Sequence, residues 1–262
     1  MLKTTIAQDF LSKGYVICDI CDLDVFSNLQ DAMTHEINVA LGNANVGELE
    51  QVHQHIPHHD INRVRLHVYK TLNARPHFIE EYYSMFKPAV DALLGTELAS
   101  QNKINLNIQM PNDPTSLLGL HTDTVSGQSE FEIVAWLPFT RTYDSNSMYI
   151  FDFKTSQKML SLLPNYQKKG MEQLYLDWKD KSLAITLKPG QGLIFSSALM
   201  HGNLLNQTPT TRISLNTRFK SLFSPYNTIE HSEKKLGNFY RPLRISPVTK
   251  LALQYQEPES EF

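Results

Sequence analysis

Three residues in two short segments, eighty positions apart, could form a metal site. His121 and Asp123 stand two positions apart in His-Thr-Asp, and a lone histidine, His201, follows much later. Two imidazoles and one carboxylate make the facial triad that holds ferrous iron, and the same donor set suits manganese, cobalt or nickel. Because only three coordination positions would be filled by the protein, the opposite face of the ion would stay open for a co-substrate and oxygen.

An arginine follows His201 at a spacing that suits the binding of an anionic co-substrate beside the metal. Arg212 lies eleven positions after His201, and Ser214 two positions further on. A 2-oxo acid that chelates a metal through its 1-carboxylate and ketone leaves a distant carboxylate, which a guanidinium can bind in bidentate fashion. Ser214 would share a strand face with Arg212 and could add a hydroxyl donor. Candidates for binding the other end of the 2-oxo acid are Asn105, Asn107 and Gln109, with Thr122 and Thr124 as weaker candidates.

Short strands are predicted to position these side chains. From residue 103 onward, apolar residues alternate with Asn105, Asn107 and Gln109, which is the period of a strand with one polar face. Further apolar segments are separated by proline, glycine and asparagine turns, a pattern typical of a β-sandwich or jelly roll. Such a fold would bring His201 close to His121 and Asp123, which we expect on one strand end. The predicted strands are 104–110, 130–138, 147–153, 183–187, 192–196, 204–205 and 211–219.

Helices are predicted before and between these strands. Residues 6–24 suggest a short helix followed by a strand. Helical spacing of apolar residues predicts a helix over 24–41 with Asp24 as its N-cap, and another over 75–94 that ends at Gly95. The aromatic stripe of the second helix should pack on a sheet. A further helix is expected at the start of the 156–181 insert.

Composition indicates an ordinary globular chain. The sequence has 262 residues, of which 41% are hydrophobic and 19% charged. Its net charge of −3 argues against a nucleic-acid binder, and no apolar run approaches a membrane span. The first residues lack the apolar region of a signal peptide, so we expect a cytoplasmic enzyme. We predict a single domain, 1–262, with a helical part (1–100), a jelly-roll core (101–226) and a tail (227–262) that wraps the surface and ends in a frayed acidic stretch at 257–261.

Two other motifs receive ordinary interpretations. Cys18 and Cys21 lie in a predicted strand and lack a second pair at zinc spacing, so a redox or zinc role is disfavoured. Four histidines crowd the segment 53–59, but Pro57 interrupts it and no carboxylate stands at ligand spacing before Asp60. We expect a polar loop there, over the mouth of the barrel, and no second metal site.

Several segments resemble one family. Leu120–Asp123 and Leu193–Asn203, with Gly14-Tyr15-Val16-Ile17 before a helix, resemble the phytanoyl-CoA dioxygenase-like group of 2-oxoglutarate/Fe(II) oxygenases. The stretch 211–220 is most similar to bacterial members associated with carbohydrate and aminoglycoside biosynthesis. The resemblance covers most of the chain up to about Tyr226.

The resemblance implies a fold, a cofactor system and a reaction. The fold would be a double-stranded β-helix, mainly β with helices packed outside, that binds iron through His121, Asp123 and His201 and 2-oxoglutarate through Arg212. In this group oxygen and 2-oxoglutarate give succinate and carbon dioxide while a bound substrate is oxidised, usually to an alcohol. Asp123 is present, whereas related halogenases replace the ligand carboxylate with a small residue. Hydroxylation is therefore expected, or desaturation or cyclisation by the same chemistry.

The substrate side remains open at this point. Arg218 shares the predicted strand face of Arg212 and would bind an anionic substrate group or pair with surface acids. Trp136, Tyr149 and Asn105 could line the pocket, although core packing is the ordinary role of aromatic residues such as Trp136 and Tyr149. We expect a small polar metabolite such as a sugar or sugar conjugate. The alternatives are a cupin-like isomerase or hydrolase that does not use 2-oxoglutarate and a non-catalytic barrel that binds a ligand.

Overall fold

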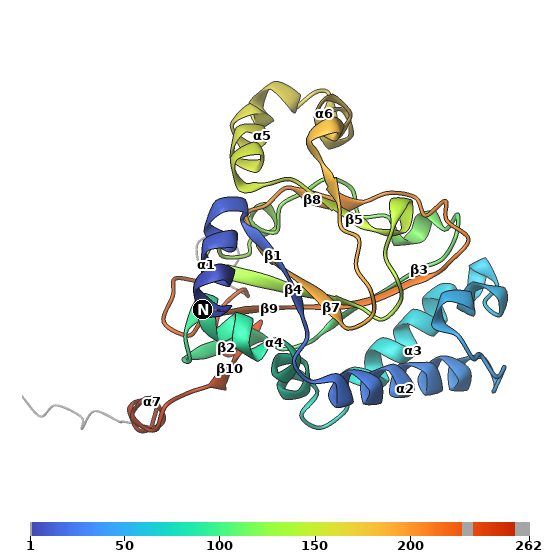
Figure 1. Cartoon of the computed structure of the whole chain (residues 1–262), viewed down its shortest axis with the longest axis horizontal. Coiled ribbons are helices and arrows are strands. Elements are labelled where there is room, and N and C mark those ends of the chain that lie inside the picture. The colour runs from blue at the N-terminus through green and yellow to red at the C-terminus, as the bar shows by residue number, and fades with distance from the viewer. Residues whose placement is uncertain (1, 227–232, 255–262) are drawn as a thin grey trace, which may run out of the picture.

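Two antiparallel sheets form the centre of the molecule (Figure 1). The computed structural model describes residues 2–226 and 233–254. Within these residues, one sheet has seven strands in the order β1-β7-β4-β9-β2-β10, with β3 paired to β9, and the other has the order β6-β5-β8. The strands are β1 Tyr15–Asp19, β2 Leu98–Gln101, β3 Asn105–Gln109, β4 Glu132–Pro138, β5 Met148–Ile150, β6 Leu183–Ala184, β7 Gln191–Ser196, β8 His201–Asn203, β9 Arg212–Ser221 and β10 Tyr240–Arg244.

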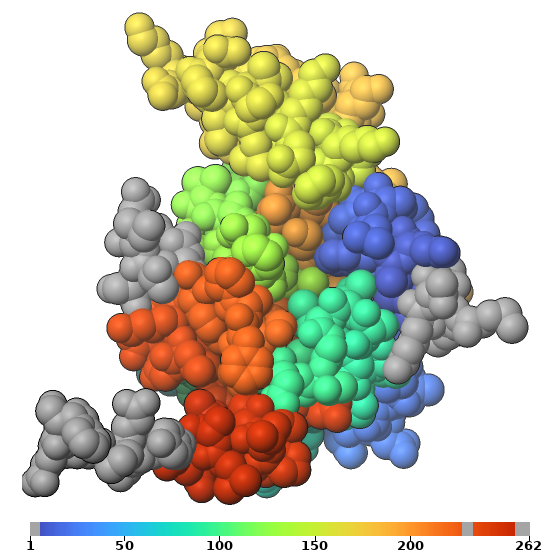
Figure 2. Space-filling view, turned by 90° about the vertical axis from the view of Figure 1, so that its left-hand side faces the viewer, coloured from blue at the N-terminus to red at the C-terminus, as the bar shows by residue number. Residues whose placement is uncertain are grey.

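Helices cover the outer faces of both sheets, which gives four layers (Figure 1). Helices α2 to α4 pack on the large sheet, whereas α5 and α6 pack on the small one and project from the body as a lobe (Figure 2). Strand β4 explains the order of the layers, because its side chains alternate between Ile133 and Ala135 on the helix side and Val134 and Trp136 on the side of the small sheet. The α-helices are α1 Leu2–Lys13, α2 Leu23–Ala40, α3 Ile61–Asn73, α4 Phe78–Leu94, α5 Phe153–Tyr166, α6 Gly170–Trp178 and α7 Pro247–Ala252.

The predicted helices are present, with small changes at their ends. In α2, Leu29, Met33 and Ile37 are buried as the apolar spacing indicated. Its N-cap is Asp22 and not Asp24, because the Asp22 carboxylate accepts a hydrogen bond from the Val25 N–H at 3.1 Å. The stripe of α4 is buried against the large sheet, and the helix ends at Gly95, which has φ 84°.

Other sequence expectations differ from the structure. Residues 204–205 are not a strand, because the strand in this region is β8 and the chain leaves the sheet after Asn203. The segment 49–60 is not an irregular loop but two 3-10 helices, Leu49–Gln54 and His58–Asp60. Asp123 is not in a strand and begins a 3-10 turn, Thr124–Ser126.

The C-terminal region contributes to the sheet and does not only wrap the surface. Strand β10 pairs antiparallel with β2 at the edge of the large sheet, and α7 follows it. The acidic stretch predicted at 257–261 lies outside the described residues. None of the described helices is long and apolar enough to cross a membrane.

Candidate metal centre and its cavity

The backbone brings His121 and His201 together. The two residues form an isolated antiparallel bridge, in which the N–H of His121 donates to the His201 carbonyl at 3.0 Å and the N–H of His201 donates back at 2.9 Å. A pair that exchanges both hydrogen bonds places its side chains on one face. The ring centroids consequently lie 4.2 Å apart.

Both imidazoles are held in the tautomer that a metal ligand needs. Nδ1 of His121 hydrogen-bonds the Gly119 carbonyl at 2.8 Å, and Nδ1 of His201 hydrogen-bonds the Leu199 carbonyl at 2.9 Å. A carbonyl can only accept, so each Nδ1 carries a proton and Nε2 is the ring atom that can bind a metal. Burial lowers the pKa of His201 to about 4, which keeps this ring neutral at neutral pH.

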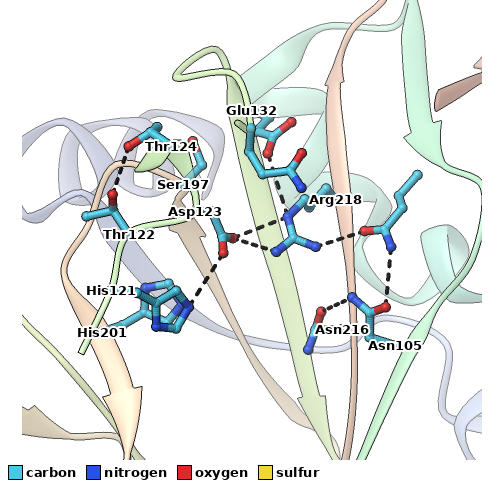
Figure 3. A network of polar contacts seen from close by, with 12 residues as sticks. Asn105, His121, Thr122, Asp123, Thr124, Glu132, Ser197, His201, Asn216 and Arg218 are labelled. Carbon is cyan, nitrogen blue, oxygen red and sulfur yellow. Dashed lines mark hydrogen bonds and ion pairs between the residues drawn. The ribbon is translucent and has the colours of Figure 1, made fainter. Parts of the chain in front are cut away.

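Asp123, the third residue of the candidate metal site, lies at the start of a turn and not in a strand. Its backbone N–H donates to the Ser197 carbonyl at 3.0 Å, and its φ and ψ of −64° and −30° are helical. The expected strand geometry for His-Thr-Asp was therefore wrong, but the turn directs the carboxylate towards the histidines (Figure 3). Oδ1 of Asp123 lies 3.7 Å from Nε2 of His121.

The three side chains form a possible metal site. Their ligand atoms lie within 4.8 Å of one another, and no other group of three or more His, Cys, Asp or Glu in the described part of the chain is arranged in this way. Burial by itself would raise the pKa of Asp123, but the nearby Arg218 guanidinium and the two histidines lower it below its usual value. Asp123 is thus a carboxylate beside two free Nε2 atoms, a suitable donor set for a divalent transition metal.

A cavity of about 280 Å³ adjoins this group. Strand β9 supplies every second residue of one wall: Arg212, Ser214, Asn216 and Arg218. Asn216 was missed in the sequence, although the same period-2 spacing that identified Ser214 would have found it. The other lining residues are Asn105, Leu106, Asn107, Leu118, Val134, Trp136, Met148, Phe195, Gly202 and Asn203.

Among the residues that the structure describes, Arg212 is a buried cation without an acidic partner. Its Nη1 donates to the Asn146 carbonyl at 2.9 Å and its Nη2 to the Asn107 side-chain oxygen at 3.0 Å, and the guanidinium carbon lies 5.7 Å from the centre of the Trp136 ring. Burial lowers its pKa to about 9, so the group stays cationic at neutral pH. Nε of Arg212 and Oγ of Ser214 are buried and have no hydrogen-bond partner in the described part of the chain. Buried charge and unsatisfied polar atoms are costly, and their convergence on a cavity indicates a site for an anion.

The remaining candidates from the sequence do not line the cavity. Gln109 is not brought to the cavity; it is buried and donates to the Leu204 carbonyl at 2.6 Å. Tyr149 packs against Phe151 and Tyr175 under α6. Thr122 and Thr124 hydrogen-bond each other at 2.9 Å. They lie beside Asp123 but are not part of the cavity wall.

Neither of the two motifs given ordinary interpretations lines this cavity. His53 hydrogen-bonds the Thr211 hydroxyl at 2.9 Å, and no metal-binding group is found among the described residues of 53–59. Cys18 and Cys21 are both free, and burial raises the pKa of Cys18 to about 12, so this thiol stays protonated.

The sequence matches no family model and no curated protein. Solved structures do match. A non-heme monooxygenase, the ThoJ–nickel complex, is 18% identical with a TM-score of 0.55, over 85% of this chain and 80% of that chain. The chain shares its fold with non-heme oxygenases. The α-ketoglutarate-dependent carbocyclase SnoK from nogalamycin biosynthesis is 13% identical (TM-score 0.54; 92% and 93% covered), and EctD from S. alaskensis, solved with 2-oxoglutarate and 5-hydroxyectoine, is 16% identical (TM-score 0.53; 84% and 76%).

Proposed function

We propose that the chain is a non-haem iron oxygenase that couples oxidative decarboxylation of 2-oxoglutarate to hydroxylation of a small polar metabolite, of the sugar or sugar-conjugate type, in a biosynthetic pathway of the cytoplasm. The two facing sheets would be a double-stranded β-helix with helices packed outside. The shared fold with 2-oxoglutarate-dependent enzymes supports this proposal.

The observation that carries the proposal is the pair of unsatisfied atoms on β9. Nε of Arg212 and Oγ of Ser214 are buried at the cavity that also contains the His121–Asp123–His201 group. A dicarboxylate that chelates the metal at one end would present its second carboxylate to a guanidinium and a hydroxyl at the other. A cupin-like enzyme without an oxo-acid co-substrate would have no use for this buried cation.

The residues fit both groups. His121 and His201 would bind iron through Nε2, and Asp123 through a carboxylate oxygen, while Arg212, Ser214 and Asn107 would bind 2-oxoglutarate. When bound, iron and 2-oxoglutarate supply the oxidising chemistry with O2. The protein orients them: carbonyls fix the two imidazoles, and the apolar side chains of Val134, Met148 and Phe195 on the cavity wall limit the access of water.

Loss of a ligand tests the proposal. His201→Ala should abolish succinate formation from 2-oxoglutarate, because the metal loses one of three protein bonds. We expect the variant to keep a cooperative thermal transition. The matched control is His35→Ala, at an exposed position of α2, which should leave the rate unchanged. Succinate is measured with ferrous iron, oxygen and 2-oxoglutarate; formation at the wild-type rate in His201→Ala would exclude the assignment.

A further inference from the structure

Arg218 contacts the carboxylate of the proposed metal ligand (Figure 3). Its Nη2 lies 2.8 Å from Oδ2 of Asp123, and its Nε donates to the same oxygen at 3.2 Å. Two N–H groups of one guanidinium thus converge on one oxygen of one carboxylate. Charge-assisted hydrogen bonds of this kind are among the strongest in proteins.

The two carboxylate oxygens of Asp123 therefore have different surroundings. Oδ2 is taken by Arg218, whereas Oδ1 is the oxygen that approaches Nε2 of His121, at 3.7 Å. A carboxylate can bind a metal through one oxygen or through both. With Oδ2 held by the guanidinium, only Oδ1 is available to a metal.

Arg218 is itself fixed by neighbouring strands. Its Nη1 donates to the side-chain oxygen of Gln101 from β2 at 2.9 Å, and its Nε lies 3.7 Å from a carboxylate oxygen of Glu132 from β4. The side chain is only 13% exposed. Of the two roles expected for Arg218, substrate binding or pairing with acids, these contacts favour the second, with Asp123 and Glu132 as buried partners in place of surface acids.

We propose that Arg218 is a positioning residue that restricts Asp123 to a single metal bond. The inference rests on the proposed metal site of His121, Asp123 and His201. Its consequence is a coordination number: an ion that takes six ligands would keep three positions for small molecules, whereas a bidentate Asp123 would occupy one of them. A chelating oxo acid would take two of these positions, and the position that a singly bound Asp123 leaves would then be available to oxygen.

The test counts water molecules on bound Mn²⁺ without any co-substrate. Manganese is added to the metal-free protein, and the number of bound waters is determined from the broadening of its EPR lines in ¹⁷O-water. Arg218→Met, which removes both hydrogen bonds to Oδ2, should carry one bound water fewer than the wild type. Arg218→Lys, which can still donate to Oδ2, should restore the wild-type number. The exposed Arg141→Met serves as the control and should not change it.

The outcomes separate this inference from the proposed function. An unchanged water count in Arg218→Met overturns the role of Arg218 and leaves the metal site standing, whereas a wild-type protein that binds no manganese overturns both. A merely structural role of Arg218 would alter stability but not the count. If Arg218→Met does not fold, the double variant Arg218→Met/Glu132→Gln replaces it. The second substitution removes the buried carboxylate of Glu132, which would otherwise lose the nearby guanidinium. The same loss of one bound water is expected.

Discussion

Two arginines on one face of β9 have opposite electrostatic surroundings. Arg218 is paired with Asp123, whereas Arg212 is fully buried and, among the described residues, has no carboxylate against it. A protein rarely buries a cation without compensation. This difference supports different partners in the proposed function: Asp123, the proposed metal ligand, for Arg218, and an anion that would enter the cavity for Arg212.

Replacement of Arg212 should weaken 2-oxoglutarate binding selectively. Loss of a charged hydrogen bond costs about 1.5–3 kcal/mol, which corresponds to roughly 10- to 100-fold in the dissociation constant. We expect this loss in Arg212→Met and a smaller one in Arg212→Lys, which keeps the charge but not the bidentate fork. Anaerobic titration of the iron-loaded protein, followed by the visible charge-transfer band, measures it. Iron affinity without co-substrate is the control; equal 2-oxoglutarate affinity in all three proteins would contradict the role of Arg212.

Much of the proposed site could be predicted from the sequence, because it depends on residue types at short spacings. His121, Asp123, Arg212 and Ser214 were found in this way, and all four lie at one cavity. What could not be predicted depends on pairing between distant strands. Nothing in the sequence around Arg218 indicates that its guanidinium meets Asp123, which lies 95 positions earlier.

At the scale of elements, the close contact between β7 and α4 depends on a glycine. A Cβ atom on Gly192 would overlap the ring of Phe86 and lie 3.3 Å from the Trp136 carbonyl of β4. The absence of a side chain lets the aromatic stripe of α4 reach the sheet. This contact helps to hold β7 and β4 in place, and the residues on the opposite faces of these two strands line the cavity.

Gly192→Ala should therefore destabilise the protein. Overpacking of this kind typically costs about 1–3 kcal/mol, whereas Gly47→Ala should stay within about 0.5 kcal/mol because a Cβ there meets no atom within 4 Å. Urea denaturation gives both values. Addition of Phe86→Leu to Gly192→Ala should recover part of the loss, because a smaller side chain gives the new methyl group room. Equal free energies of unfolding for the two alanine variants would show that the α4–β7 contact accommodates the added methyl group without loss of stability.

Elements with a strong local period were predictable, and elements that exist only through distant partners were not. The helices over 24–41 and 75–94 follow from their apolar spacing and are confirmed as α2 and α4. Strand β10 contains Pro242 and two arginines and has no strand signal of its own; it is a strand because it pairs with β2. The helix α3 was overlooked, although Ile61, Val64, Val68 and Leu72 have helical spacing.

At the scale of the whole molecule, a polar chain connects the C-terminal strand to the proposed metal centre. Tyr240 of β10 donates hydrogen bonds to Glu132 of β4 and, at 2.9 Å, to Gln128. Glu132 in turn lies 3.7 Å from the guanidinium of Arg218, which holds Asp123. Residues from β10, β4 and β9 thus meet in one buried network, and its charge state should affect the stability of the entire fold.

The pH dependence of unfolding should reveal this network. Burial raises the pKa of Glu132 from 4.5 to about 7, against the lowering effect of the Tyr240 hydrogen bond. The folded state then binds more protons than the unfolded state between these values, so the contribution of Glu132 to stability is full below pH 4.5 and is lost as the pH rises through about 7. In urea denaturation of the metal-free protein, the wild type should lose stability relative to Glu132→Gln over this interval, by about 3 kcal/mol at most.

Tyr240→Phe provides the complementary measurement. Without the hydroxyl the ionised Glu132 loses a donor, its pKa should rise further, and the loss of stability should extend to higher pH than in the wild type. The two variants thus shift the same curve in opposite ways: one removes the titrating group and the other makes its ionisation less favourable. Identical pH profiles for wild type and Glu132→Gln would mean that Glu132 titrates alike in the folded and unfolded chains, which would contradict the effect predicted from its burial.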